Sequence, residues 1–132
     1  MGKMLFYSLL SVVSLTFLVP SGFAEWKMEK TKIDFLLHSI AEIDGVFIRN
    51  DSEHTAKEAV SHLRMKLERG MNSWFAPDKE EWTAEMFIDK LASKSSLSGK
   101  PYTIKFSDGR MVLSKEWLYE KLKSFESKSP DE

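Results

Sequence analysis

The fold is decided by one stretch, Tyr102-Thr103-Ile104-Lys105-Phe106-Ser107-Asp108-Gly109-Arg110-Met111-Val112-Leu113. Apolar and polar residues alternate over residues 102–106, as expected of a half-buried strand. Asp108-Gly109 is a strong hairpin turn signal, and residues 111–113 then return as a second strand. Ser114 follows and is expected to cap a last helix. A hairpin that leads directly into a helix indicates an α+β fold.

Three further helices are predicted before this hairpin. Apolar residues recur at helical spacing from about Thr31 to Ile43, where Asp44-Gly45 ends the pattern. The second helix has the clearest start signal, because Thr55 and Glu58 form a capping box, and it runs to about residue 69. The third helix is expected from Thr83 to about residue 92.

The remaining segments complete the predicted sheet and its loops. Val46-Phe47-Ile48 is β-branched and aromatic and predicts a short strand, with residues 49–52 as its exit loop. Residues 93–101, here called the serine loop, are rich in Ser, Gly and Lys. The sum is about four helices with a small three-stranded, mostly antiparallel sheet. It forms a single domain over residues 25–126, followed by a disordered tail over residues 127–132.

The composition excludes several classes of protein. The chain has 132 residues, which is too short for two typical domains, and 42% of them are apolar, as in folded proteins. With 19 Lys and Arg against 20 Asp and Glu, it lacks the basic excess of a nucleic-acid binder. Because it has no cysteine, disulfides, thiol catalysis and cysteine-based zinc sites are excluded.

The N-terminal segment has the pattern of a signal peptide. Lys3 precedes an uncharged apolar run over residues 5–19, and Gly22-Phe23-Ala24 supplies small residues before a cleavage site. Residues 1–24 are therefore predicted to be a signal peptide, which places the mature chain in the periplasm or outside the cell. The alternative is an uncleaved anchor, which would be the chain's only contact with a membrane.

The second helix carries the first candidate for chemistry. Glu58, His62 and Lys66 follow one another at one-turn intervals, so Glu58 can orient the imidazole of His62 as a base or metal ligand. The plainer interpretation is an exposed ion pair between neighbouring turns. His54 extends the spacing, but it precedes the helix cap, and we predict no metal site.

The serine loop is the second candidate. Ser95, Ser96, Ser98, Gly99 and Lys100 resemble part of a phosphate-binding loop, but the required preceding glycine and the hydroxyl after the lysine are absent. Hydroxyls and a lysine can still bind an anion. The alternative is a solvated turn that uses Ser and Gly for its geometry.

A third candidate is the aromatic loop, residues 70–82, which holds Trp74, Phe75 and Trp82. These side chains either fold back over the core or present an apolar surface to a partner protein, since Trp is enriched at interfaces.

Two stretches together resemble a known family. They are Phe47-Ile48-Arg49-Asn50 leading into Glu58-Ala59, His62-Leu63-Arg64 and Lys66, and the segment from Ala92 to Tyr102. The pattern is similar to that of small exported bacterial proteins grouped as a domain of unknown function, over about residues 33–122. The resemblance implies export and a single domain, and it implies no activity. This chain departs from the family pattern at Asp51, at His54 and in its longer aromatic loop.

The sequence has many polar residues in its motifs but no recognisable nucleophile–base pair. This favours a non-enzymatic binding or protein-interaction module. Its partner would be a protein or a small anionic ligand, with no cofactor. The binding candidates are Arg49, Asn50, Glu58, His62, Lys66, Ser95, Ser96, Ser98, Gly99, Lys100 and Tyr102. The alternative is a small hydrolase or transferase in which His62 is the base, Glu58 orients it, and Ser96 or a neighbouring serine of the loop is the nucleophile.

Overall fold

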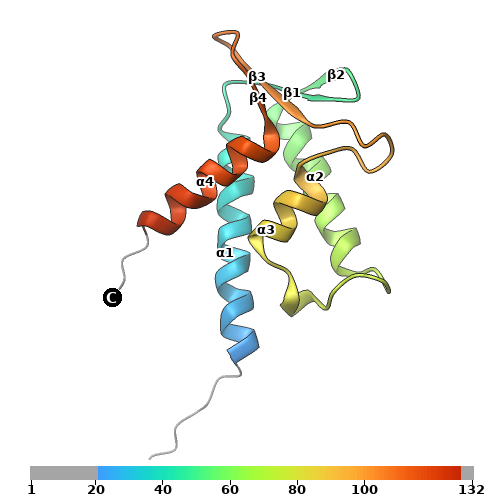
Figure 1. Ribbon diagram of the computed structural model, residues 1–132, viewed down its shortest axis with the longest axis vertical. Helices are drawn as coiled ribbons and strands as arrows, with labels where there is room; N and C mark the ends of the chain where they lie inside the picture. The colour runs from blue at the N-terminus through green and yellow to red at the C-terminus, as the bar shows by residue number, and fades with distance from the viewer. Residues whose placement is uncertain (1–20, 129–132) are drawn as a thin grey trace, which may run out of the picture.

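The computed structural model describes residues 21–128, and the predicted C-terminal hairpin is present in it (Figure 1). Strands β3 (Thr103–Phe106) and β4 (Met111–Leu113) are antiparallel, and Ile104 lies opposite Val112. The turn closes where the amide of Gly109 donates to the carbonyl of Phe106, with Gly109 at a φ of 92° that favours glycine.

The sheet has four strands, in the order β2-β1-β3-β4, and the prediction of three was wrong. Strand β2 (Ser52–His54) begins at the last residue of the predicted exit loop, and it forms a hairpin with β1 (Gly45–Arg49). Asn50 and Asp51 both adopt positive φ, 50° and 65°, which is the geometry of a tight hairpin turn. The short polar strand after that turn lacks the β-branched residues that identify strands in a sequence.

Helix α1 (Ser21–Ala41) begins well before the predicted start at Thr31. The hydroxyl of Thr31 donates to the carbonyl of Lys27 inside the helix, and Trp26 packs in the core at 8% exposure. Helix α2 (Ala56–Met71) begins as predicted, because Thr55 and Glu58 form the reciprocal capping box.

The predicted third helix is divided. Thr83 caps α3 (Ala84–Met86), and the chain then continues in the wider π-helical turn η2 (Phe87–Ala92). This winding buries four of its side chains, which are Phe87, Ile88, Leu91 and Ala92. The aromatic loop contains a short 3-10 turn, η1 (Lys79–Glu81). The serine loop is a loop, as predicted.

The last helix, α4 (Ser114–Lys128), extends into the predicted tail, so residues 127 and 128 are helical. Ser114 does not act as the expected cap; its buried hydroxyl donates to the carbonyl of Ala92 over 3.0 Å. The rest of the tail and residues 1–20 of the predicted signal peptide lie outside the described residues.

The helices pack on one face of the sheet, where Phe47 and Ile104 lie in the core (Figure 1). The α+β class and the four helices are confirmed. None of the helices within residues 21–128 is both long and apolar enough to cross a membrane.

Candidate functional site

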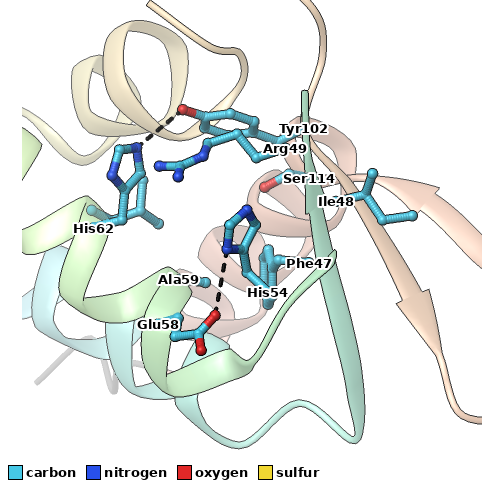
Figure 2. A pocket seen from close by; sticks show the side chains of 10 residues that line it. Phe47, Ile48, Arg49, His54, Glu58, Ala59, His62, Tyr102 and Ser114 are labelled. Carbon is cyan, nitrogen blue, oxygen red and sulfur yellow. Dashed lines mark hydrogen bonds and ion pairs between the residues drawn. The ribbon is translucent and has the colours of Figure 1, made fainter. Parts of the chain in front are cut away.

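A cavity of about 230 Å³ lies between the first hairpin and helix α2 (Figure 2). We call it the Arg49 cavity. Its walls are formed by strand β1, His54 of β2, two turns of α2 and the residues at the two ends of the second hairpin. The lining residues are Phe47, Ile48, Arg49, His54, Glu58, Ala59, His62, Leu63, Tyr102 and Ser114.

The alternation of β1 explains why a charged residue lies in this cavity. Phe47 is buried against the helices, and side chains two residues apart on a strand point to the same face. Arg49 therefore points to the helical face as well. His54 pairs with Phe47 across the hairpin, which places its ring on that same face.

The carboxylate of Glu58 contacts His54 and not His62. Its Oε2 lies 3.4 Å from Nδ1 of His54, and it also accepts the backbone N–H of Thr55 over 3.3 Å. The predicted orientation of His62 by Glu58 is therefore not formed. The cause is strand β2, which brings His54 to the start of the helix.

His62 belongs to a different chain of hydrogen bonds. Its Nε2 lies 3.4 Å from the hydroxyl of Tyr102, and Nζ of Lys66 donates to that hydroxyl over 3.2 Å. Because the ammonium can only donate, the hydroxyl accepts from Lys66, and the tautomer of the imidazole sets the direction of its bond to His62. Lys66 is buried and also donates to the carbonyls of Leu91, over 2.7 Å, and Lys94, over 3.3 Å.

The protonation of this group follows from burial and from neighbouring cations. Burial, and then the positive charges of Arg49 and Lys66, lower the pKa of His62 from 6.5 to about 4. The imidazole is therefore neutral near neutral pH. Burial, reinforced by Arg49, also lowers the pKa of Lys66, whereas burial raises that of Tyr102.

Arg49 has no counter-ion in the part of the chain that the structure describes. It is half-buried, and over residues 21–128 its side chain forms neither a hydrogen bond nor an ion pair. Figure 2 shows its guanidinium reaching from β1 toward His62 and Tyr102. A half-buried guanidinium with unused donors is a ready site for an anion.

The serine loop uses its polar groups internally. The hydroxyl of buried Ser95 accepts from the side-chain amide of Asn50 over 3.2 Å and from the backbone N–H of residues 97 and 98. Ser98 donates to the side-chain oxygen of Asn50, and Lys100 pairs with Asp51 over 2.7 Å. Gly99, at a φ of 71°, allows the loop to turn back. These contacts fasten the serine loop to the first hairpin.

The structure thus divides the candidate residues into two sets. Arg49, His62, Lys66 and Tyr102 gather at or behind the cavity, while Asn50, Ser95, Ser98 and Lys100 hold the loop. Ser96 is exposed and has no hydrogen bond within residues 21–128. Since His62 bonds to Tyr102 and not to a serine, the geometry gives no support to the hydrolase alternative.

Sequence reasoning missed the cavity's apolar wall. Phe47, Ala59 and Leu63 are buried core residues, and they lie beside Arg49 only because the strand packs on the helix. The one available signal was the alternation of β1, which places a cation on its buried face.

The aromatic loop is also divided. Trp82 is buried at 2% exposure, while Trp74 and Phe75 are almost fully exposed, at 98% and 100%. Trp82 therefore folds back over the core, whereas Trp74 and Phe75 form an exposed apolar surface. In the described part of the chain, no group of three or more His, Asp or Glu side chains is placed to hold a metal ion.

Comparison with known proteins gives a family. The model of a family of unknown function, DUF5329, matches residues 27–126. The chain is also 41% identical over 93 residues to a protein of Salmonella typhimurium (strain LT2) named "Uncharacterized protein YfeK". That match covers 70% of this chain and 72% of the Salmonella protein. No solved structure matches the chain.

Proposed function

The chain belongs to this DUF5329 family of unknown function, and we propose that it is an exported, non-enzymatic module that binds a small anion in the Arg49 cavity. The observation that carries the proposal is the guanidinium of Arg49, half-buried at a cavity and without a counter-ion over residues 21–128. Burial of a charge is costly unless a partner compensates it, so a bound anion would stabilise this arrangement.

The charges around Arg49 also favour the binding of an anion. The charge of Arg49 perturbs the pKa values of His62, Lys66 and Tyr102, so all four groups share one positive environment. The nearest carboxylate on the cavity wall, Glu58, is occupied by His54 and by the helix cap. An incoming anion therefore meets a positive site and no competing internal partner.

Ligand binding is tested by thermal denaturation of the protein purified from the cells that produce it. The melting temperature is measured with a panel of inorganic and organic anions at constant ionic strength, because a ligand that binds the folded state raises it. At least one anion is expected to raise the melting temperature of the wild type and of Arg64→Met, an exposed control on α2. The shift should vanish in Arg49→Met. Equal shifts in all three proteins would contradict the proposal.

Export is supported by the sequence of residues 1–24, with its basic start, apolar middle and small-residue end. The test is N-terminal sequencing of the protein from separated cell fractions. A chain that begins at Glu25 in the periplasmic fraction is the expected result. A chain that retains residues 1–24 in the membrane fraction would replace export by anchoring.

A second candidate function, contact with a partner protein, is favoured by the exposure of Trp74 and Phe75. Large aromatic side chains that are exposed next to each other commonly anchor interfaces. Affinity capture with the double variant Trp74→Ala/Phe75→Ala should lose a partner that the wild type recovers. Leu97→Ala is the matched control, because Leu97 is as exposed as Trp74 and lies on the serine loop. Identical recovery with all three proteins would exclude this role.

A further inference from the structure

The hydrogen-bond donors at the Arg49 cavity can be counted individually. The hydroxyl of Tyr102 is hydrogen-bonded to both His62 and Lys66, and the hydroxyl of Ser114 donates to the carbonyl of Ala92. The ammonium of Lys66 already has three oxygen acceptors. The guanidinium of Arg49, whose N–H groups have no acceptor within residues 21–128, therefore supplies the free donors.

The charge available to a ligand is a single positive charge. His62 is neutral near neutral pH, and His54 is already paired with Glu58. Lys66 lies behind Tyr102 with its protons committed to protein oxygens. Arg49 alone can thus neutralise a ligand, and one guanidinium matches one carboxylate in a bidentate contact.

Part of the cavity wall is apolar. Phe47, Ala59 and Leu63 are buried core residues whose surfaces face the cavity. They offer no hydrogen bonds, so they favour a hydrocarbon group. The volume of about 230 Å³ corresponds to about eight water-sized groups, at about 30 Å³ each.

We propose that the Arg49 cavity binds a small monocarboxylate with an apolar substituent, with the carboxylate on Arg49 and the hydrocarbon against Phe47, Ala59 and Leu63. This inference rests on the proposed function, because it names the class of anion that the same cavity takes. Short-chain aliphatic acids and simple aromatic acids belong to this class.

Inorganic phosphate suits the same site less well. It carries up to two negative charges at neutral pH and several oxygen acceptors, and each of these needs a donor or water. Arg49 can satisfy two oxygens, and the apolar wall would desolvate the others without compensation. The cavity should therefore bind carboxylates with an apolar group more tightly than small, fully polar anions.

The test is titration of the protein, purified from the cells that produce it, with hexanoate and four other compounds. Each of the four lacks one feature of hexanoate, either its carboxylate or most of its hydrocarbon chain. Acetate keeps the carboxylate and removes most of the hydrocarbon. Hexan-1-ol and hexylammonium keep the chain and remove or invert the charge, and inorganic phosphate supplies an anion without a hydrocarbon. NMR spectra of the methyl groups of Ala59 and Leu63 report whether the ligand enters the cavity. Hexanoate is expected to bind at least about tenfold more tightly than each of the four.

Two substitutions of Arg49 separate charge from geometry. Arg49→Met should abolish hexanoate binding. Arg49→Lys keeps the positive charge but loses the planar fork, so we expect binding weakened by about tenfold. Arg64→Met should bind hexanoate as the wild type does. Circular dichroism of each variant establishes that it is folded, and Arg49→Lys keeps the test valid if Arg49→Met unfolds.

The outcomes distinguish this inference from the proposed function. Hexanoate bound equally by Arg49→Met and the wild type, or bound without shifts at Ala59 and Leu63, would overturn the inference. If phosphate binds through Arg49 more tightly than hexanoate, the apolar carboxylate class is wrong while anion binding stands. If no anion of the thermal panel binds through Arg49, both proposals fail.

Discussion

The serine loop and the Arg49 cavity meet at the end of β1, yet their polar groups are in opposite states. In the loop, Ser95 and Ser98 are hydrogen-bonded to Asn50, and Lys100 is paired with Asp51. In the cavity, the adjacent residue Arg49 has no partner over residues 21–128. A run of hydroxyls can thus be structural, whereas one charged group without a partner indicates where a ligand can bind.

The largest effect is expected at Lys66, which joins the two regions by donating to Tyr102 and to the carbonyls of Leu91 and Lys94. Lys66→Met keeps the length of the side chain but leaves these buried oxygens without a donor. We expect the free energy of unfolding to fall by about 2–4 kcal/mol. Urea denaturation measures it, with Lys57→Met, on the exposed side of α2, as the control. Equal stability of the two variants would show that Lys66 does not connect loop and cavity.

Ser95→Ala should have the next largest effect, and it sharpens the comparison by acting on the loop alone. The buried hydroxyl accepts from Asn50 and from two backbone amides, so its removal should cost about 1–3 kcal/mol of unfolding free energy. Ser96→Ala removes an exposed hydroxyl one residue away and should change nothing. Hexanoate affinity should be the same in both variants. A loss of affinity in Ser95→Ala would contradict the separation of loop and cavity.

The first hairpin shows what sequence reasoning could and could not predict about the fold. The turn at Asp108-Gly109 is predictable because an alternating segment precedes it and an apolar segment follows it. The turn at Asn50-Asp51 has equally suitable residues, but only three polar residues follow it, so the sequence does not predict β2. The start of α1 was missed because residues 21–30 show no sharp apolar stripe, although Trp26 is buried there.

The candidate site was predictable as a set of residues and not as an arrangement. The spacing of Glu58 and His62 allowed an ion pair, but β2 supplied His54 as a nearer partner. Likewise, nothing local to Arg49 indicates whether a carboxylate lies beside it. That depends on how strand and helix pack, which involves residues far apart in the chain.

The dependence of stability on pH also tests the cavity, and solvent screening of the half-buried ring of His62 keeps its effect below that of the two substitutions. The folded state holds the pKa of His62 at about 4, whereas in the unfolded chain it returns to about 6.5. As the pH falls from about 6.5 to about 4, the unfolded chain takes up this proton first, so stability decreases. His62→Gln should remove this decrease. His38→Gln, at an exposed position of α1, should leave this decrease intact. If stability still decreases to the same extent in His62→Gln, the decrease does not come from His62.

The smallest effect is expected at the exposed end of the serine loop. The ion pair between Lys100 and Asp51 is short, at 2.7 Å, but both side chains are more than half exposed. Water and salt screen such a pair, so Lys100→Met should cost less than about 0.5 kcal/mol in urea denaturation. Because this lysine is already paired and Arg49 is not, hexanoate affinity should survive Lys100→Met and be lost in Arg49→Met. If hexanoate affinity were instead lost in Lys100→Met and kept in Arg49→Met, the serine loop would be the binding site and the cavity a structural feature.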